Sequence, residues 1–274
     1  MDSRSQPSFE ITNFPSLSSA PAPAPSAPPV KQTLLPTSAR PTSGIDPAPI
    51  AEARVETCDA VELLRRLPDA SVDLIVTDPA YESLEKHRAI GTTTRLKHSK
   101  SSSNDWFTIF PNARFPELFQ EAHRVLKKHA HLYLFCDQET MFVAKPDGEK
   151  AGFKFWKPIV WDKCAIGMGY HYRSRYELVL FFEKGKRKLH DLSVPDILTE
   201  RPTRGGSPRE KPPAVSEVLV RQSSDPGDLV VDPFCGSGSV GVAARKLGRR
   251  FLGSDICPEA VEVTRERLTG RMGP

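Results

Sequence analysis

The sequence predicts an α/β fold in which helices cover both faces of a doubly wound, mostly parallel sheet of seven strands. Short segments rich in β-branched and aromatic residues alternate with segments whose apolar residues recur at helical spacing. This alternation is typical of a sheet whose parallel strands are connected by helices. Because no internal repeat interrupts the pattern, one domain accounts for it.

The expected elements follow one another in a regular order. Strands are predicted near residues 54–58, 72–77, 131–136, 155–161, 176–183, 229–232 and 251–255. Helices are predicted at about residues 60–67, 115–127, 138–149, 214–223, 240–247 and 258–268. The second helix shows the pattern most clearly, since Phe115, Phe119 and Ala122 lie on one face that suits packing against the sheet.

Residues 1–50 are expected to form a disordered tail, and residues 51–274 the folded domain. The tail holds 11 of the 26 prolines, and its only aromatic residues are Phe9 and Phe14. A segment with so few apolar side chains cannot offset the entropy cost of ordering its backbone.

Composition excludes several classes of protein. There is no basic start followed by an apolar run, so no secretory signal is expected. There is also no run of about 20 apolar residues, so no membrane span is expected. The five cysteines lie far apart without a C-x-x-C pair, which favours reduced thiols in a cytoplasmic protein over a disulfide framework or a metal cluster.

Two polar stretches, residues 82–110 and 184–211, interrupt the alternation. The first contains Arg95 and Lys97, and the second has eight Lys or Arg residues against four acids. Long loops in compact domains are usually functional or disordered. We therefore expect the first to be a mobile loop that contacts nucleic acid. The second is expected to be a short target-recognition region, with a solvated linker as the alternative for each. Its basic candidates are Lys186, Arg187 and Lys188.

The segment Asp78-Pro79-Ala80-Tyr81 directly follows the predicted strand 72–77. The Asp78 carboxylate and the Pro79 carbonyl can both accept hydrogens from one exocyclic amine, and Tyr81 offers a ring for stacking. Such a strand end suits a planar ring that carries an amino group. Asp-Pro is also a common turn signal, so a turn is the alternative.

A second strand end, at 229–232, opens into a glycine loop. Glycines let the backbone approach a ligand, and the following helix presents N–H groups at its amino terminus. About 20 residues further on, a strand ends in Asp255, whose carboxylate can accept both hydroxyls of a ribose. No G-x-x-x-x-G-K-[ST] loop is present, which disfavours a triphosphate. The candidate residues of the loop are Asp232, Phe234, Gly236, Ser237 and Gly238.

Together these two motifs resemble motifs IV and I of the S-adenosylmethionine-dependent DNA amino-methyltransferases, which act on adenine N6 or cytosine N4. Their order, with the catalytic loop before the cofactor loop, is similar to the permuted β group. The resemblance covers about residues 55–268. It implies a Rossmann-like methyltransferase sheet, S-adenosylmethionine as cofactor and double-stranded DNA as partner. It also implies a restriction-modification context and a cytoplasmic, nucleoid-associated location.

Further positions match the same family. Lys211, in Glu-Lys-Pro, is similar to motif X and by resemblance lies near the methionine part of the cofactor. Asp59 matches motif III near the adenine, but it is equally a helix N-cap. Residues 169–185 look like motif VIII, although an edge strand would also explain them. The motif VIII candidates for nucleic-acid contact are Tyr172, Arg173 and Arg175.

The expected function is a site-specific DNA methyltransferase that acts on N6 of a flipped adenine. Asp78 favours adenine, because in the resembling family aspartate at this position goes mostly with adenine and serine more often with cytosine. Ala80 departs from the usual proline but removes neither amine acceptor nor the stacking ring. Since the recognition region is short, we expect a short site, or one extended by a homodimer partner. The alternatives are a cytosine-N4 enzyme, an RNA adenine methyltransferase and a non-catalytic cofactor-binding subunit.

Overall fold

The computed structural model describes residues 52–83, 108–167, 171–202 and 211–270. All of them belong to one compact unit, Ile45–Pro274. The predicted tail lies outside the described residues, as do Arg95 and Lys97. Within the described residues, no helix has the length and apolar character needed to cross a membrane.

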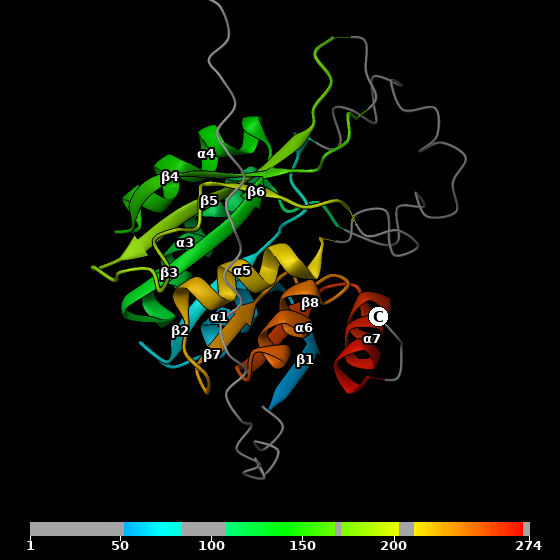
Figure 1. Ribbon diagram of the computed structural model, residues 1–274. Coiled ribbons are helices and arrows are strands. Elements are labelled where there is room, and N and C mark those ends of the chain that lie inside the picture. Colours follow the sequence, from blue (N-terminus) through cyan, green and yellow to red (C-terminus); the bar gives the residue numbers. More distant parts are fainter. Residues whose placement is uncertain (1–51, 84–107, 168–170, 203–210, 271–274) are drawn as a thin grey trace, which may run out of the picture. The chain divides into compact units, whose positions relative to one another are not determined.

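One sheet with the strand order β1-β8-β7-β2-β3-β5-β4-β6 forms the centre of this unit (Figure 1). β5 pairs antiparallel with β3 and β4, and all the other strand pairs described are parallel. The predicted α/β class and mostly parallel sheet are therefore confirmed. The strands are β1 (Ala53–Thr57), β2 (Val72–Thr77), β3 (Leu126–Cys136), β4 (Lys154–Asp162), β5 (Tyr176–Lys184), β6 (Ile197–Thr199), β7 (Leu229–Asp232) and β8 (Arg250–Asp255).

The described sheet has eight strands, whereas the sequence predicted seven. The additional strand, β6, lies within the stretch expected to be a loop and pairs with β4 over only three residues. A strand this short leaves no alternation pattern in the sequence. β6 is held by tertiary pairing at the sheet edge and could not be predicted from local composition.

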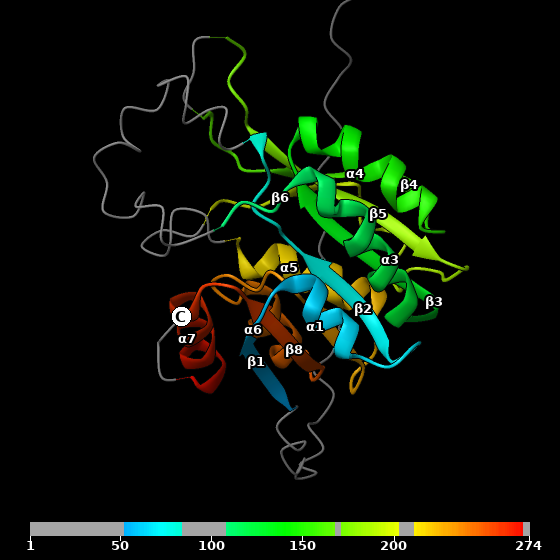
Figure 2. The same cartoon turned by 180° about the vertical axis from the view of Figure 1, so that it is seen from behind.

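Helices cover both faces of the sheet, as Figures 1 and 2 show from opposite sides. Alternate residues of β2 point to opposite faces. Ile75 packs with α1, α3 and α4, whereas Leu74 and Val76 pack with α5 and α6. The helices are α1 (Ala60–Arg66), α3 (Phe115–Val125), α4 (Gln138–Lys150), α5 (Pro213–Ser223), α6 (Ser239–Lys246) and α7 (Pro258–Thr269), with a 3-10 turn η2 (Asn112–Arg114).

The boundary between α3 and β3 differs from the prediction. α3 ends at Val125 and β3 begins at Leu126, five residues before the predicted start at 131. Leu126 is buried and continues the helical spacing of apolar residues, which concealed the change. Its pairing with Val72 of β2 holds it in the strand.

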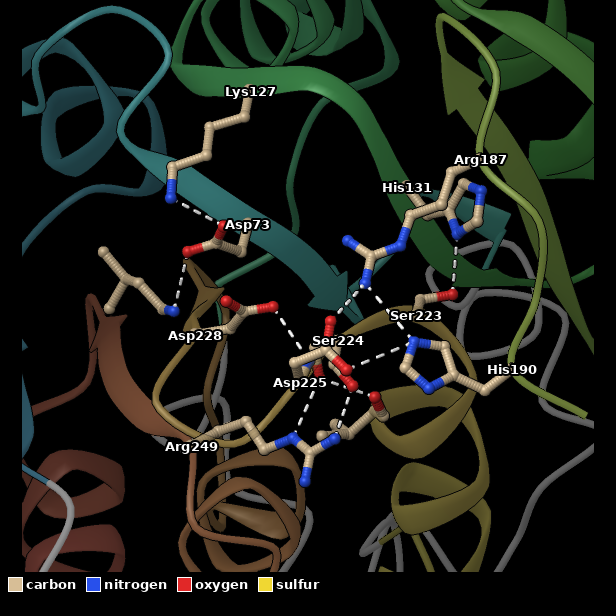
Figure 3. A network of polar contacts seen from close by, with 12 residues as sticks. Asp73, Lys127, His131, Arg187, His190, Ser223, Ser224, Asp225, Asp228 and Arg249 are labelled. Atoms are coloured by element: carbon tan, nitrogen blue, oxygen red, sulfur yellow. Dashed lines mark hydrogen bonds and ion pairs between the residues drawn. The ribbon is translucent and has the colours of Figure 1, made fainter.

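Polar side chains anchor the amino ends of the central strands (Figure 3). Asp73 of β2 accepts hydrogen bonds from Lys127 Nζ at 2.7 Å and from the Leu229 backbone N–H at 3.0 Å, which joins β2 to β3 and β7. Ser223 Oγ lies 2.7 Å from His131 Nδ1 and 2.7 Å from the Tyr133 hydroxyl. Burial lowers the pKa of His131 to about 4, so its ring is neutral at neutral pH. This histidine therefore belongs to the packing of the core.

Candidate active site

The carboxyl ends of β8, β7 and β2 lie side by side because these strands are neighbours in the sheet. Asp255 ends β8, Asp232 ends β7, and Asp78 directly follows β2. Thr77, the last residue of β2, donates its hydroxyl to Asp232 Oδ1 at 2.8 Å. The Asp-Pro-Ala-Tyr segment and the glycine loop are thus brought together at one edge of the sheet, although they are far apart in the sequence.

Asp232 supports the loop from within the protein. Its residue is 2% exposed, and its carboxyl group also accepts a hydrogen bond from the Phe234 backbone N–H at 3.1 Å. Burial raises the pKa of Asp232 to about 8, although hydrogen bonds from Thr77 and Phe234 oppose this rise. Asp232 therefore fixes the turn between β7 and the glycine loop. The structure gives it this bracing role, and a direct contact of Asp232 with the cofactor stays a prediction.

α7 holds the glycine loop from behind. The Thr264 hydroxyl donates to the Gly236 carbonyl at 2.7 Å, and Arg267 Nη1 donates to the Ser237 carbonyl at 2.6 Å. Gly238 has φ 84° and precedes α6, in a region that favours glycine. A Cβ on Gly238 would lie 2.7 Å from Thr264 Cγ2. Glycine is thus required at this position by both backbone conformation and space.

Asp255 shapes the same loop from β8. It accepts hydrogen bonds from the Gly236 N–H at 3.0 Å and the Cys257 N–H at 2.9 Å. Burial raises its pKa, and backbone N–H groups of Cys257, Gly236 and Ile256 oppose that rise. A carboxylate offers about four acceptor sites. Two of these sites are engaged by the backbone N–H groups of Gly236 and Cys257, and the contact of this carboxylate with ribose hydroxyls stays a prediction.

Asp59 is the N-cap of α1 and also an ion-pair partner. It accepts from the backbone N–H groups of Val61 and Glu62 at 3.0 and 3.2 Å, so the N-cap alternative is confirmed. Arg114 then binds both of its oxygens, at 2.7 and 3.0 Å. The hydrogen bond from Arg114 lowers the pKa of Asp59, although burial opposes this effect. A direct role for Asp59 in holding a ligand stays a prediction.

Two residues that sequence reasoning missed build the wall beside Phe234. The Arg114 guanidinium lies 5.2 Å from the centre of the Phe110 ring, and Phe110 packs edge-to-face on Phe234 with ring centres 5.0 Å apart. Phe110 also donates its backbone N–H to the Ala80 carbonyl at 2.7 Å. This aromatic corner therefore touches both loops. No motif in the sequence identifies Arg114 or Phe110.

Tyr81 lies in the wall of the site. Its residue is 7% exposed, it forms an isolated bridge with Phe110, and burial raises its pKa. Asp78 is more open, with 28% of its side chain exposed, and its Oδ2 lies 2.8 Å from Lys211 Nζ. Lys211 is thus brought to the Asp-Pro-Ala-Tyr segment. This contact was not expected from the sequence.

The connection between β4 and β5 projects from the same edge of the sheet, because β5 is antiparallel and begins there. Tyr172 and Arg173 are exposed. Arg175 makes a two-point ion pair with Asp162, with N–O distances of 2.6 and 2.7 Å. Arg175 therefore fixes the base of this hairpin, and the two exposed side chains are presented to solvent.

The basic cluster Lys186, Arg187 and Lys188 is not brought to this site. It follows the end of β5, where Lys184 pairs with Ala130 at the opposite edge of the sheet. Arg187 Nη2 lies 3.1 Å from Asp225 Oδ2 in the network of Figure 3. The geometry gives these residues no contact with the Asp78 region, and their binding to nucleic acid stays a prediction.

Within the described residues, no group of three or more His, Cys, Asp or Glu side chains is arranged to hold a metal ion. The chemistry available at this edge is that of two strand-end loops, with Asp78 and backbone carbonyls as acceptors beside a glycine loop and an aromatic corner.

Comparison with known proteins finds a DNA methylase family model and several similar DNA methyltransferases. A family model described as DNA methylase (N6_N4_Mtase) matches residues 72–266. The DNA adenine methyltransferase YhdJ of Escherichia coli (strain K12) is 28% identical over 251 residues, which cover 77% of this chain and 80% of the relative. The M1.HpyAVI–SAM complex has a TM-score of 0.59 and 22% identity, covering 78% of this chain and 99% of that one. The cytosine-N4-specific PvuII DNA methyltransferase has a TM-score of 0.61 and 17% identity, covering 79% and 86%.

Substitution of Gly238 by alanine is expected to destabilise the protein more than the same change at Gly227. Both have positive φ, at 84° and 89°, but a Cβ at Gly227 meets nothing within 4 Å. Backbone strain of roughly 1–3 kcal/mol is thus common to both variants, and Gly238→Ala adds the contact with Thr264. Urea denaturation of the two variants measures the difference. Equal losses of unfolding free energy would show that α7 does not press on the loop.

Proposed function

The chain belongs to the N6/N4 DNA methylase family, and from this premise we propose that it is a site-specific DNA methyltransferase that transfers a methyl group from S-adenosylmethionine to N6 of a flipped adenine. The observation that supports this most directly is the hydrogen bond between Thr77 and Asp232. It joins the strand that carries the amine-binding segment to the strand that carries the cofactor loop. The amine-binding segment and the cofactor loop are therefore held at the same edge of the sheet.

The amine is held by the Asp78 carboxylate and the Pro79 carbonyl. The nitrogen lone pair of an exocyclic amine is delocalised into its ring, which makes it a weak nucleophile. Two acceptors on the amine hydrogens orient the nitrogen and draw it towards tetrahedral geometry. S-adenosylmethionine, when bound, supplies an electrophilic methyl group on a sulfonium. Positioning and electrostatic stabilisation by the protein account for most of the rate enhancement, and no covalent enzyme intermediate is needed.

The residues around the glycine loop fit this cofactor. Asp255 has acceptor capacity for a ribose hydroxyl, and Gly236 and Gly238 leave the backbone uncovered by side chains. Phe234, which is partly exposed and packs against the buried Phe110, provides an apolar surface for an adenine ring. Asp59, next to β8 through the hydrogen bond from Cys58 N to the Asp255 carbonyl, lies close to the same corner.

Double-stranded DNA is the proposed partner, with the β4–β5 hairpin as the contact nearest to Asp78. A base in a duplex cannot reach a strand-end pocket, so the target must be flipped out. Tyr172 and Arg173 are exposed on this hairpin and suit stacking and phosphate contact. Residues 184–202 contain only one short strand, β6, and therefore offer little structure for DNA recognition. We propose that a homodimer extends the DNA-binding surface of the protein. Action on DNA also supports a cytoplasmic, nucleoid-associated location.

Asp78→Ala should nearly abolish methyl transfer and leave cofactor affinity almost unchanged, because this carboxylate serves the amine. Asp255→Ala should instead weaken cofactor binding, since a charge-assisted hydrogen bond contributes roughly 1.5–3 kcal/mol. Calorimetry with S-adenosylmethionine and tritiated methyl transfer to duplex DNA separate the two effects. Loss of cofactor binding in the Asp78 variant would contradict the assignment, and transfer to structured RNA alone would move the substrate from DNA to RNA.

The hairpin and the Lys186–Lys188 segment should differ in their effect on DNA binding. Arg173→Ala should reduce the salt dependence of binding by about 0.9 for one lost phosphate contact. The comparison variant is Lys186→Ala with Lys188→Ala, which tests the nucleic-acid contact predicted from the sequence; because this segment lies at the opposite edge of the sheet from Asp78, we expect the slope to change less than in Arg173→Ala. Titrations of labelled duplex at several salt concentrations measure both slopes. A change only in the comparison variant would transfer DNA binding to that edge.

The modified base is expected to be N6-methyladenine. Both adenine and cytosine present an exocyclic amine with two hydrogens, so the two acceptors of Asp78 and Pro79 alone could bind either base. The aspartate at the first position and the relative described as a DNA adenine methyltransferase support adenine. Nucleoside mass spectrometry of methylated DNA identifies the product. Detection of N4-methylcytosine alone would overturn the choice of base and leave the roles of Asp78 and Pro79 intact.

A further inference from the structure

Four charged side chains of alternating sign form a row behind the amine-binding segment. Lys211 Nζ lies 2.8 Å from Asp78 Oδ2 and 2.7 Å from Glu177 Oε2. Lys163 Nζ lies 3.0 Å from Glu177 Oε1. Asp78 follows β2, Lys211 precedes α5, Glu177 lies near the start of β5, and Lys163 follows β4. The row therefore connects separate parts of the fold and ends at the proposed amine acceptor.

Lys211 is the most enclosed member of the row. Its side chain is 10% exposed, and its Nζ lies 5.4 Å from the centre of the Phe135 ring and 5.9 Å from that of Trp161. A buried ammonium is stable only when counter-charges compensate the loss of its hydration. Burial alone would lower the pKa of Lys211, but the Asp78 and Glu177 carboxylates outweigh it and raise this pKa.

Glu177 forms an ion pair with Lys211 and thereby compensates part of its positive charge. Burial would raise the pKa of Glu177, but Lys211 and Lys163 outweigh it and lower this pKa. Lys211 and Glu177 therefore remain charged at neutral pH. Each charge of the row has a partner of opposite sign at hydrogen-bonding distance, so the four charges sum to zero inside a largely enclosed region.

We propose that Lys211, held by Glu177, is a positioning residue that fixes the orientation and the negative charge of the Asp78 carboxylate for the reacting amine. This proposal rests on the proposed function, since it gives Asp78 the role of amine acceptor. It differs from the role expected by resemblance, in which Lys211 lies near the methionine part of the cofactor. A protonated carboxyl would offer a weaker acceptor, and a rotated one would no longer orient the nitrogen.

Two substitutions should shift the ionisation of Asp78 in opposite directions. Lys211→Met removes a neighbouring positive charge, which should raise the pKa of Asp78 and move the acid limb of the kcat profile to higher pH. Glu177→Gln removes a nearby negative charge, so Asp78 becomes the main counter-charge of Lys211. This change should lower the pKa of Asp78 and move the acid limb to lower pH. A purely structural loss would not give opposite shifts, because both side chains occupy the same cluster.

The remaining titratable groups around this cluster are the same in both variants. Burial raises the pKa of Tyr81 and of the Cys136 thiol, and raises that of Asp232 to about 8. Asp137, at the start of α4, accepts hydrogen bonds from the Thr140 N–H and the Ser83 hydroxyl. The acid limb is therefore read below pH 7, where Asp232 remains protonated.

The test compares kcat, KM and cofactor affinity in the full-length protein. Lys211→Met should lower kcat by roughly 100-fold, the scale of a misplaced catalytic group, with the dissociation constant for S-adenosylmethionine unchanged. Lys211→Arg, which keeps the charge, should recover part of kcat. In an Asp78→Asn background, Lys211→Met should have no further effect. The matched control is Lys157→Met, because Lys157 pairs with Asp196 at 2.7 Å on the exposed side of β4.

The Asp78 pKa is also measured without catalysis, by NMR titration of protein labelled with ¹³C-aspartate, using Asp78→Asn to assign the signal. Opposite shifts in Lys211→Met and Glu177→Gln, with none in Lys157→Met, would support the proposal. Shifts in the same direction, or a loss of cofactor affinity as the main effect of Lys211→Met, would overturn it. If the two variants show these shifts but the wild-type protein methylates no DNA, the proposed function fails while the positioning of Asp78 stands.

Discussion

The hydrogen bond from Thr77 to the buried carboxyl of Asp232 is the interaction on which the rest of the site depends. It joins the carboxyl ends of β2 and β7, and each of these strands leads directly into one of the two loops. Burial raises the pKa of Asp232 to about 8, so this group is mainly protonated at neutral pH and avoids the cost of an uncompensated buried charge. A neutral carboxyl can also both donate and accept, which suits a position between two backbone segments.

The two edges of the sheet carry different kinds of polar structure. Near the amino ends of β2, β3 and β7, the network of Figure 3 connects these strands through Asp73 and Lys127, and it connects β3 to α5 through Ser223. At the carboxyl ends, polar groups instead hold loops, as Thr264 and Arg267 do for the glycine loop. The carboxyl ends thus carry loops with partly exposed acceptors such as Asp78, and parallel sheets generally bind their ligands at these ends.

The sequence predicts the parts of this structure that follow from local pattern. Alternation of strands and helices indicates the sheet, and the strand-end motifs indicate Asp78 and the glycine loop. The ion pairs of Asp59 with Arg114 and of Asp78 with Lys211 join segments that are distant in the chain. They leave no periodic signal, so only the folded arrangement reveals them. The same reason explains Arg187: its basic neighbours indicate a nucleic-acid surface, yet the fold places it beside Asp225.

The row of charges also connects the proposed DNA contact to the proposed amine acceptor through a continuous series of polar contacts. Arg175 fixes the base of the β4–β5 hairpin by its ion pair with Asp162, and its carbonyl accepts the Lys163 backbone N–H at 2.9 Å. Lys163 in turn pairs with Glu177, which leads to Lys211 and Asp78. One member of the row, Glu177, therefore lies on β5, and another, Lys163, directly follows β4. The base of the hairpin and the Asp78 carboxylate are thus linked by consecutive ion pairs, so the proposed DNA contact and the proposed amine acceptor share a common structural support.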